Sequence, residues 1–141
     1  MPEIRHLISI EAPPQKVYAA LATSAGLASW WTADSTADGT VGGKAEFGFD
    51  HRSVIYRMAI ETLDSNRQVV WTCRGGNPEW VGTTLTWTIE PSDGGSLLRF
   101  TQSGWRDMTD MVATCNSTWG ELMYRLKASA EGKNPGPHWR E

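Results

Sequence analysis

The sequence predicts an α+β fold in which a curved antiparallel β-sheet wraps around one long C-terminal α-helix. Three observations predict it. Apolar residues recur at spacings of three and four near the C-terminus, apolar and polar residues alternate with a period of two between residues 41 and 105, and two short helical segments follow the first strand. A one-faced sheet and a one-sided helix each need an apolar partner, so we expect them to bury each other.

The N-terminal part combines one strand with two short helices. Ile4–Glu11 alternates between apolar and polar positions and is predicted to be a strand. Pro13 and Pro14 end this strand and favour the first turn of a helix. A second short helical turn is predicted over Leu27–Trp31, and the small, polar segment Thr32–Thr40 is predicted to be a loop.

Five further strands are predicted from period-two patterns bounded by turn residues. Each places apolar side chains on one face and polar side chains on the other, which is typical of an antiparallel sheet with one wet face. The predicted strands are Lys44–Asp50, Ser53–Leu63, Gln68–Arg74, Thr83–Glu90 and Ser96–Trp105. These five are predicted to form a meander, and with the N-terminal strand the sheet has six predicted strands.

The last helix is predicted over Asp107–Gly132. Its apolar residues fall on one side, centred on Met108, Cys115, Trp119 and Leu126. Charged residues lie toward the opposite side, and the glycine at the end of the range supplies a stop signal. Such a helix is too apolar on one face to stand alone, so it needs the concave sheet as its partner.

The whole chain, residues 1–141, is predicted to be a single domain with room for a core and a cavity. Residues 133–141 are predicted to be an irregular tail, and whether Trp139 folds back onto the domain is left open. Eight tryptophans are unusual for this length. They indicate either a large interior or an aromatic binding surface.

Composition excludes several classes of function. The net charge is −3 and no basic run occurs, which argues against nucleic-acid binding. No apolar run is long enough to span a membrane and no signal-peptide core is present, so a cytoplasmic location is expected. Cys73 and Cys115 are expected to be small buried hydrophobes rather than a disulfide. The three histidines are too scattered for a metal site, and neither a metal nor another cofactor is expected.

Several short segments resemble a known group of proteins. They are Ile10–Pro13, Val17–Leu21, Leu27–Trp31, Val41–Gly43, Trp119–Leu122 and Leu126–Lys127. Together they resemble the SRPBCC superfamily, which shares the helix-grip fold of START proteins and the birch-pollen allergen. Within it, the likeness is to proteins named for the activator of heat-shock protein 90 ATPase. The resemblance covers nearly the whole chain.

The resemblance implies a helix-grip fold with a deep, mostly apolar pocket between the sheet and the C-terminal helix. Members of the superfamily bind lipids, sterols, polyketides or plant hormones there, and some are cyclases. The co-chaperone namesakes carry an additional N-terminal domain for which this chain has no room. Fold resemblance alone does not fix the function.

Aromatic and Met side chains on the inward faces of sheet and helix are the candidate ligand-binding residues. Each one alone is explained by core packing, whereas several together are expected to line a pocket. The candidates are Trp30, Trp31, Phe47, Phe49, Tyr56, Met58, Trp71, Trp87, Phe100, Gln102, Trp119 and Met123. The paired tryptophans at 30 and 31 either plug the core and cover the end of the sheet or form the pocket entrance.

The two polar candidates, Tyr56 and Gln102, need hydrogen-bond partners if they are buried. We favour a hydrogen bond between them or to backbone over a role in orienting a ligand oxygen. Glu79 and Trp80, in a loop, either shape the pocket rim or only connect two strands.

The primary functional hypothesis is the binding of a hydrophobic or aromatic small molecule, such as a lipid or polyketide. A cyclase- or hydrolase-like enzyme is the first alternative, with Asp50, His51 or Glu79 as acid–base candidates. No nucleophile motif or phosphate-binding loop supports it, and the catalytic residues are unknown. A protein-binding role toward a chaperone is the second alternative, and a homodimer is left open.

Overall fold

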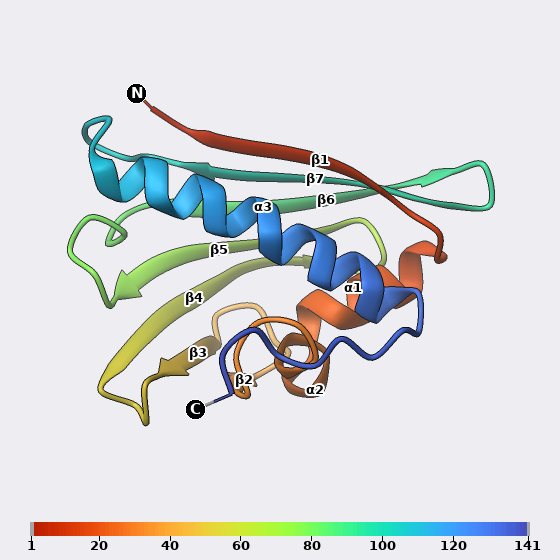
Figure 1. Ribbon diagram of the computed structural model, residues 1–141, viewed down its shortest axis with the longest axis horizontal. Helices are drawn as coiled ribbons and strands as arrows, with labels where there is room; N and C mark the ends of the chain where they lie inside the picture. Colours follow the sequence, from red (N-terminus) through yellow and green to blue (C-terminus); the bar gives the residue numbers. More distant parts are fainter. Residues whose placement is uncertain (1, 141) are drawn as a thin grey trace.

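The computed structural model describes residues 2–140 and contains, within them, one antiparallel sheet of seven strands in the order β1-β7-β6-β5-β4-β3-β2. The long helix α3 lies across one face of this curved sheet (Figure 1). The elements are β1 (Ile4–Ile10), α1 (Pro14–Ala22), α2 (Ser24–Ala28), β2 (Asp34–Ala37), β3 (Lys44–Phe49), β4 (Val54–Asp64), β5 (Gln68–Gly75), β6 (Thr84–Ser92), β7 (Gly95–Ser103) and α3 (Asp110–Ala130). The predicted α+β helix-grip fold is therefore confirmed.

The alternation predicted for the strands produces the concave apolar wall. In β6, Leu85, Trp87 and Ile89 are buried while the threonines between them are partly exposed. Neighbouring strands repeat the pattern in register, so that Trp87 lies opposite Phe100 of β7 and Val69 of β5. This register stacks large side chains on the face that α3 covers.

One strand was missed, because Thr32–Thr40 was predicted to be a loop. Residues Asp34–Ala37 form β2, which pairs with β3 at the edge of the sheet. This strand has no apolar alternation to reveal it, since an edge strand of small polar residues is held through its backbone. Ser35 is buried and donates its hydroxyl to the Thr32 carbonyl at 2.6 Å. The six-stranded expectation is wrong for this reason.

The helix α3 begins at Asp110 rather than at the predicted Asp107. Met108 precedes the helix and is 67% exposed, so its predicted place on the apolar face of the helix was wrong. The chain turns at Gly104, whose φ of +89° suits glycine, and Trp105 takes the buried position instead. The buried residues of α3 are Val112, Trp119, Leu122, Met123, Leu126 and Ala130.

The two short helices lie near the C-terminal end of α3 (Figure 1). Helix α2 begins at Ser24 rather than at the predicted Leu27, because the Thr23 side chain caps it by accepting a hydrogen bond from the Gly26 N–H. Trp30 follows this helix, is fully buried and donates its indole N–H to the Ala20 carbonyl at 2.9 Å.

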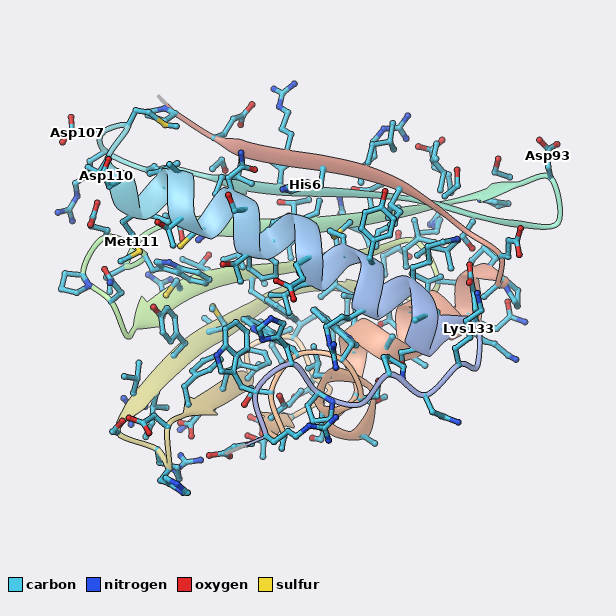
Figure 2. The ribbon with its side chains drawn as sticks, in the orientation of Figure 1. His6, Asp93, Asp107, Asp110, Met111 and Lys133 are labelled. Carbon is cyan, nitrogen blue, oxygen red and sulfur yellow. The ribbon has the colours of Figure 1, made fainter. Side chains whose placement is uncertain are left out.

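The described part of the tail, residues 133–140, contains no helix or strand and folds back along the domain. Met1 and Glu141, which belong to the predicted domain and tail, lie outside the described residues. Figure 2 marks Lys133, where this tail leaves α3. Within residues 2–140, no helix is both long enough and apolar enough to cross a membrane.

Candidate ligand-binding cavity

A cavity of about 270 Å³ lies between the concave face of the sheet and α3. Residues from four parts of the chain line it: the segment after α2, the strands β3 and β4, the loop before β6, and α3 with the tail. The lining residues are Trp31, Phe49, Val54, Tyr56, Trp80, Cys115, Thr118, Trp119, Leu122 and Trp139. Six of these ten are aromatic.

Burial separates a floor from a rim. Trp31, Trp80, Trp119 and Leu122 are at most 6% exposed and form the floor. The other lining residues are partly or largely exposed and form the rim, which consists of Phe49, Val54, Tyr56, Cys115, Thr118 and Trp139. The mouth of the cavity therefore lies between the β3–β4 hairpin, α3 and the tail.

Five aromatic rings around the cavity form a closed circuit of contacts. The ring-centroid distances are 5.2 Å for Trp31–Trp119, 5.9 Å for Trp119–Trp80, 4.6 Å for Trp80–Tyr56, 5.6 Å for Tyr56–Phe49 and 6.2 Å for Phe49–Trp31. These separations lie in the range at which aromatic pairs attract one another. Because each ring holds its neighbours, the cavity wall is preorganised.

A buried chain of hydrogen bonds fixes the central ring, Trp119. Its indole N–H donates to the Gln102 side-chain oxygen at 2.9 Å, and the Gln102 amide donates to the Thr83 hydroxyl at 3.0 Å. Thr83 in turn donates to the Trp80 carbonyl at 2.7 Å. The predicted hydrogen bond from Gln102 to Tyr56 or to backbone is therefore wrong, because both partners of Gln102 are other side chains. Gln102 does not line the cavity either; it positions one of the floor residues.

The cavity carries no formal charge on its described lining residues. Burial raises the pKa of Tyr56 to about 12, with smaller contributions from the nearby Cys115 and Cys73, while a hydrogen bond to the Asn77 backbone lowers it. Burial also raises the pKa of the Cys115 thiol, which accepts a hydrogen bond from the Trp80 indole at 3.4 Å. Both side chains are thus neutral at physiological pH, and both cysteines are free thiols.

Four of the twelve predicted site residues line the cavity: Trp31, Phe49, Tyr56 and Trp119. The other eight are at most 2% exposed and lie in the packed core below the floor, where their side chains fill the space. These are Trp30, Phe47, Met58, Trp71, Trp87, Phe100, Gln102 and Met123. Of the tryptophan pair, residue 30 plugs the core and residue 31 reaches the cavity.

Six lining residues were not among the predicted set. Cys115 and Leu122 share the buried side of α3 with Trp119, so helical periodicity could have indicated them. Thr118 lies at the margin of that face. Val54 precedes Tyr56 by two on the same strand face, whereas Trp80 and Trp139 come from irregular segments that carry no periodic signal.

The three acid–base candidates are not among the described residues that line the cavity. Asp50 and His51 occupy the exposed β3–β4 turn, where three successive residues have positive φ. Glu79 accepts a hydrogen bond from the Thr109 hydroxyl at 2.6 Å beside a smaller hollow of about 170 Å³. Among residues 2–140, no group of three or more His, Cys, Asp or Glu is arranged to hold a metal ion.

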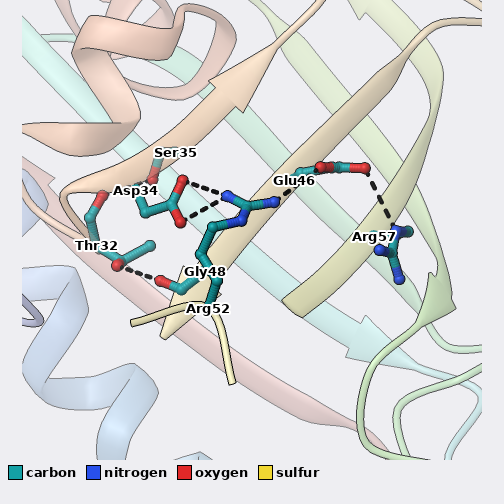
Figure 3. Close-up of polar contacts among 7 residues, drawn as sticks. All are labelled: Thr32, Asp34, Ser35, Glu46, Gly48, Arg52 and Arg57. Carbon is teal, nitrogen blue, oxygen red and sulfur yellow. Dashed lines mark hydrogen bonds and ion pairs between the residues drawn. The ribbon is translucent and has the colours of Figure 1, made fainter. Parts of the chain in front are cut away.

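An ion-pair cluster anchors the hairpin that carries the rim residues Phe49 and Val54 (Figure 3). Arg52 contacts both carboxylate oxygens of Asp34 at 2.7 and 2.6 Å and reaches Glu46 at 3.4 Å. Glu46 also pairs with Arg57 of β4 at 3.3 Å. The cluster links β2, β3 and β4 on the face of the sheet opposite the cavity.

Known proteins share both sequence and architecture with this chain. The family described as "Activator of Hsp90 ATPase homolog 1-like protein" matches residues 11–131. A search of curated proteins found no match. The structure of the Aha1 dimer from Colwellia psychrerythraea is 35% identical and has a TM-score of 0.86, and the similarity covers 94% of this chain and 98% of that one.

Two more distant structures share the fold alone. The protein MLL2253 from Mesorhizobium loti is 20% identical with a TM-score of 0.78, and the similarity covers 89% of this chain and 94% of that one. DynU16, from the dynemicin biosynthetic locus, is 17% identical with a TM-score of 0.79, and the similarity covers 99% of this chain but 51% of that one.

The family match spans most of the chain and agrees with the helix-grip architecture and with the relative from Colwellia. The resemblance drawn from the sequence is thereby confirmed. This chain belongs to the family of Activator of Hsp90 ATPase homolog 1-like proteins.

Proposed function

We propose that this protein binds an uncharged hydrophobic or aromatic small molecule in the cavity between the sheet and α3. The observation that carries the proposal is the lining itself, in which six of ten residues are aromatic and none is charged. A small-molecule site is typically such a concave, mostly apolar space with a few polar groups. An anionic headgroup would lose its hydration there without gaining a cationic partner from the lining.

The volume limits the size of the ligand. An apolar cavity of about 150 Å³ admits benzene, so about 270 Å³ accommodates roughly one to two aromatic rings. This is below the range of about 300–1,000 Å³ typical of pockets for larger ligands. A sterol or a long acyl chain therefore does not fit the cavity as it stands.

Two rim side chains supply orientation. The Tyr56 hydroxyl is neutral, and its oxygen takes the hydrogen bond from the Asn77 backbone that lowers its pKa. Its proton is therefore available for an acceptor on the ligand. The Thr118 hydroxyl donates to the Thr114 carbonyl at 3.1 Å, which leaves its oxygen to accept a hydrogen bond. A planar molecule with one hydroxyl or carbonyl group would use both the rings and these anchors.

A thermal-shift experiment with 2-naphthol tests the proposal. At a concentration of about 100 times Kd, a ligand specific for the native state raises the melting temperature by roughly 5 °C or more. Thr118→Phe fills the cavity from its rim and is expected to abolish this shift. Thr114→Phe, one helical turn away at an exposed position, is the matched control and should retain it.

The proposal fails if 2-naphthol produces no shift in the wild-type protein, or if Thr118→Phe and the control respond alike. Native mass spectrometry of the purified protein, followed by extraction under denaturing conditions, would identify a small molecule that copurifies. Decanoate and cholesterol serve as comparison ligands and are expected to give smaller shifts than 2-naphthol.

A second candidate function is association with a protein, either a second copy of this chain or a chaperone. The observation that favours it is the 35% identity to a protein described as an Aha1 dimer. Light scattering coupled to size-exclusion chromatography distinguishes a monomer from a dimer. Asp50, His51 and Glu79 are not among the residues that line the cavity.

A further inference from the structure

The tail residues 133–139, which we name the C-terminal strap, complete the rim of the cavity. The strap leaves the end of α3 and returns to the segment that follows α2 (Figure 1). Of its residues, Trp139 alone lines the cavity, and its ring contacts Phe49 edge-on at a centroid distance of 5.1 Å. The family match ends at residue 131, so the strap lies beyond the matched residues.

Backbone hydrogen bonds attach the far end of the strap. The Trp139 N–H donates to the Trp31 carbonyl at 3.0 Å, and the Ala33 N–H donates to the Trp139 carbonyl at 2.8 Å. The His138 N–H donates to the Trp30 carbonyl at 3.3 Å. Together with a parallel bridge between Thr32 and Trp139, these bonds place the strap beside the cavity floor.

A single guanidinium attaches the middle of the strap. One terminal nitrogen of Arg125, on α3, donates to the carbonyls of Pro135, Gly136 and Pro137 at 3.0, 2.7 and 3.1 Å. The two prolines fix φ at their positions, whereas Asn134 and Gly136, before and between them, have positive φ, so this segment turns rather than runs extended. The neighbouring His138 adds a contact to α3, because its Nε2 lies 3.1 Å from a carboxylate oxygen of Glu121.

The strap is held to the domain by different interactions from those that hold the cavity floor. The floor rings are buried in the core, whereas the strap is held mainly by backbone hydrogen bonds, one guanidinium and a partly exposed Trp139 ring. Segments with few buried apolar contacts open locally at a far lower free-energy cost than the core. The strap can therefore release Trp139 while the sheet and α3 stay folded.

We propose that the C-terminal strap is the gate of the cavity and that Trp139 sets the upper limit on the size of its ligand. Release of the strap opens the rim between β3 and α3, the ligand enters, and the returning indole covers it. The proposal rests on the proposed binding function and adds to it the residue that selects among ligands. With Trp139 in place the site takes about two rings, and without it the site takes larger ring systems.

The size limit is tested with two uncharged fluorescent probes, 2-naphthol and 1-hydroxypyrene, on the full chain. The wild-type protein is expected to bind 2-naphthol and to bind 1-hydroxypyrene at least tenfold more weakly. Trp139→Ala removes a two-ring side chain from the rim and is expected to reverse this preference. Tyr124→Ala removes an exposed ring from the outer side of α3 and serves as the matched control, with the wild-type preference retained.

Gating is tested separately with Arg125→Gln, which keeps Trp139 but releases the strap carbonyls. Loss of charge-assisted hydrogen bonds is expected to raise the population of the open strap by roughly tenfold. In stopped-flow measurements, both association and dissociation of 2-naphthol should become several-fold faster, with the size preference unchanged. Amide exchange at Ala33 and Trp139 should accelerate, while exchange in β6 stays as in the wild type.

The outcomes separate the two proposals. If 2-naphthol binds none of these proteins, the binding function is overturned and the gate with it. If 2-naphthol binds the wild type but Trp139→Ala keeps the wild-type size preference, the role of Trp139 is overturned and the binding function stands. If Arg125→Gln leaves the binding rates and the two exchange rates unchanged, the strap is not the gate.

Discussion

At the scale of single residues, Gln102 links the cavity to the core. Both ends of its amide are used, with Trp119 donating to the oxygen and Thr83 accepting from the nitrogen. Replacing it with an apolar residue leaves the buried Trp119 N–H without a partner, which costs about 1–3 kcal/mol. It also removes the hydrogen bond that Thr83 accepts, worth about 0.5–1.5 kcal/mol, although Thr83 still donates to the Trp80 carbonyl. The contribution of Gln102 is thus to orient the floor rather than to touch the ligand.

Gln102→Leu is therefore expected to lower the free energy of unfolding by about 2–4 kcal/mol, measured by urea denaturation. Gln15→Leu, at an exposed position of α1, is the control and should change it by less than about 0.5 kcal/mol. Equal effects of the two substitutions would contradict the buried network.

Tyr56 gives the cavity its polar anchor and keeps it neutral. Because burial raises the pKa of this phenol from 10.0 to about 12, the unfolded chain loses the proton at a lower pH than the native protein. Between these values the unfolded state binds fewer protons, so stability falls as pH rises from about 10 toward 12.

Absorbance titration should accordingly show a tyrosine ionisation step near pH 12 that vanishes in Tyr56→Phe. The loss of stability above pH 10 should also become shallower in this variant. Titration curves of the wild type and Tyr56→Phe that coincide as the pH approaches 12 would exclude the buried, neutral phenol.

At the scale of elements, the end of α3 is tied to the end of β1 through Glu131. Its carboxylate accepts a hydrogen bond from the Glu11 N–H at 2.7 Å and contacts the Lys127 and Lys133 amines at 2.6 and 3.1 Å. The hydrogen bond from Lys127, followed by that from Glu11, lowers the pKa of Glu131 from 4.5 to about 2. The carboxylate thus stabilises the fold when it is ionised.

Glu131→Gln should lower the free energy of unfolding at pH 7 by about 1–2 kcal/mol, a figure reduced for solvent screening of the two lysines. The stabilisation is fully present above pH 4.5 and is lost as the pH falls toward 2. The difference between wild type and variant should therefore shrink over this range in denaturation experiments. Glu61→Gln, in an exposed pair, is the control, and a pH-independent difference would contradict the account.

The elements also show where sequence reasoning succeeds. Period-two alternation located all five strands of the meander and the face they bury, because half-buried strands must alternate. The pattern failed at β2, whose Asp34–Ala37 sequence pairs through backbone alone, and at Met108, where a glycine turn delays the helix. Neither the edge strand β2 nor the later start of α3 produces a periodic pattern of apolar residues in the sequence.

At the scale of the whole molecule, sequence could indicate an aromatic interior but could not divide it into core and cavity. Trp87 and Trp119 look alike in the pattern, yet one is packed among rings and the other borders open space. That division depends on how side chains from sheet, helix and tail fill the space together. Trp80 and Trp139 reach the cavity from irregular segments. The sequence left open whether Trp80 shapes the pocket or only connects two strands, and whether Trp139 folds back, so the folded chain was needed to decide both.

The molecule as a whole is thus a helix-grip domain whose concave sheet is mostly filled by its own tryptophans. The remaining space is small, aromatic and uncharged, and it is covered by the end of the chain. The central claim is that this space takes a ligand.

Nuclear magnetic resonance of the eight tryptophan indole N–H groups during titration with 2-naphthol tests this claim most directly. The account predicts that the signals of Trp31, Trp80, Trp119 and Trp139 shift with one common Kd. The signals of Trp30, Trp71, Trp87 and Trp105 should stay nearly in place, because these rings do not line the cavity. Shifts absent from all eight, or spread evenly over them, would contradict it.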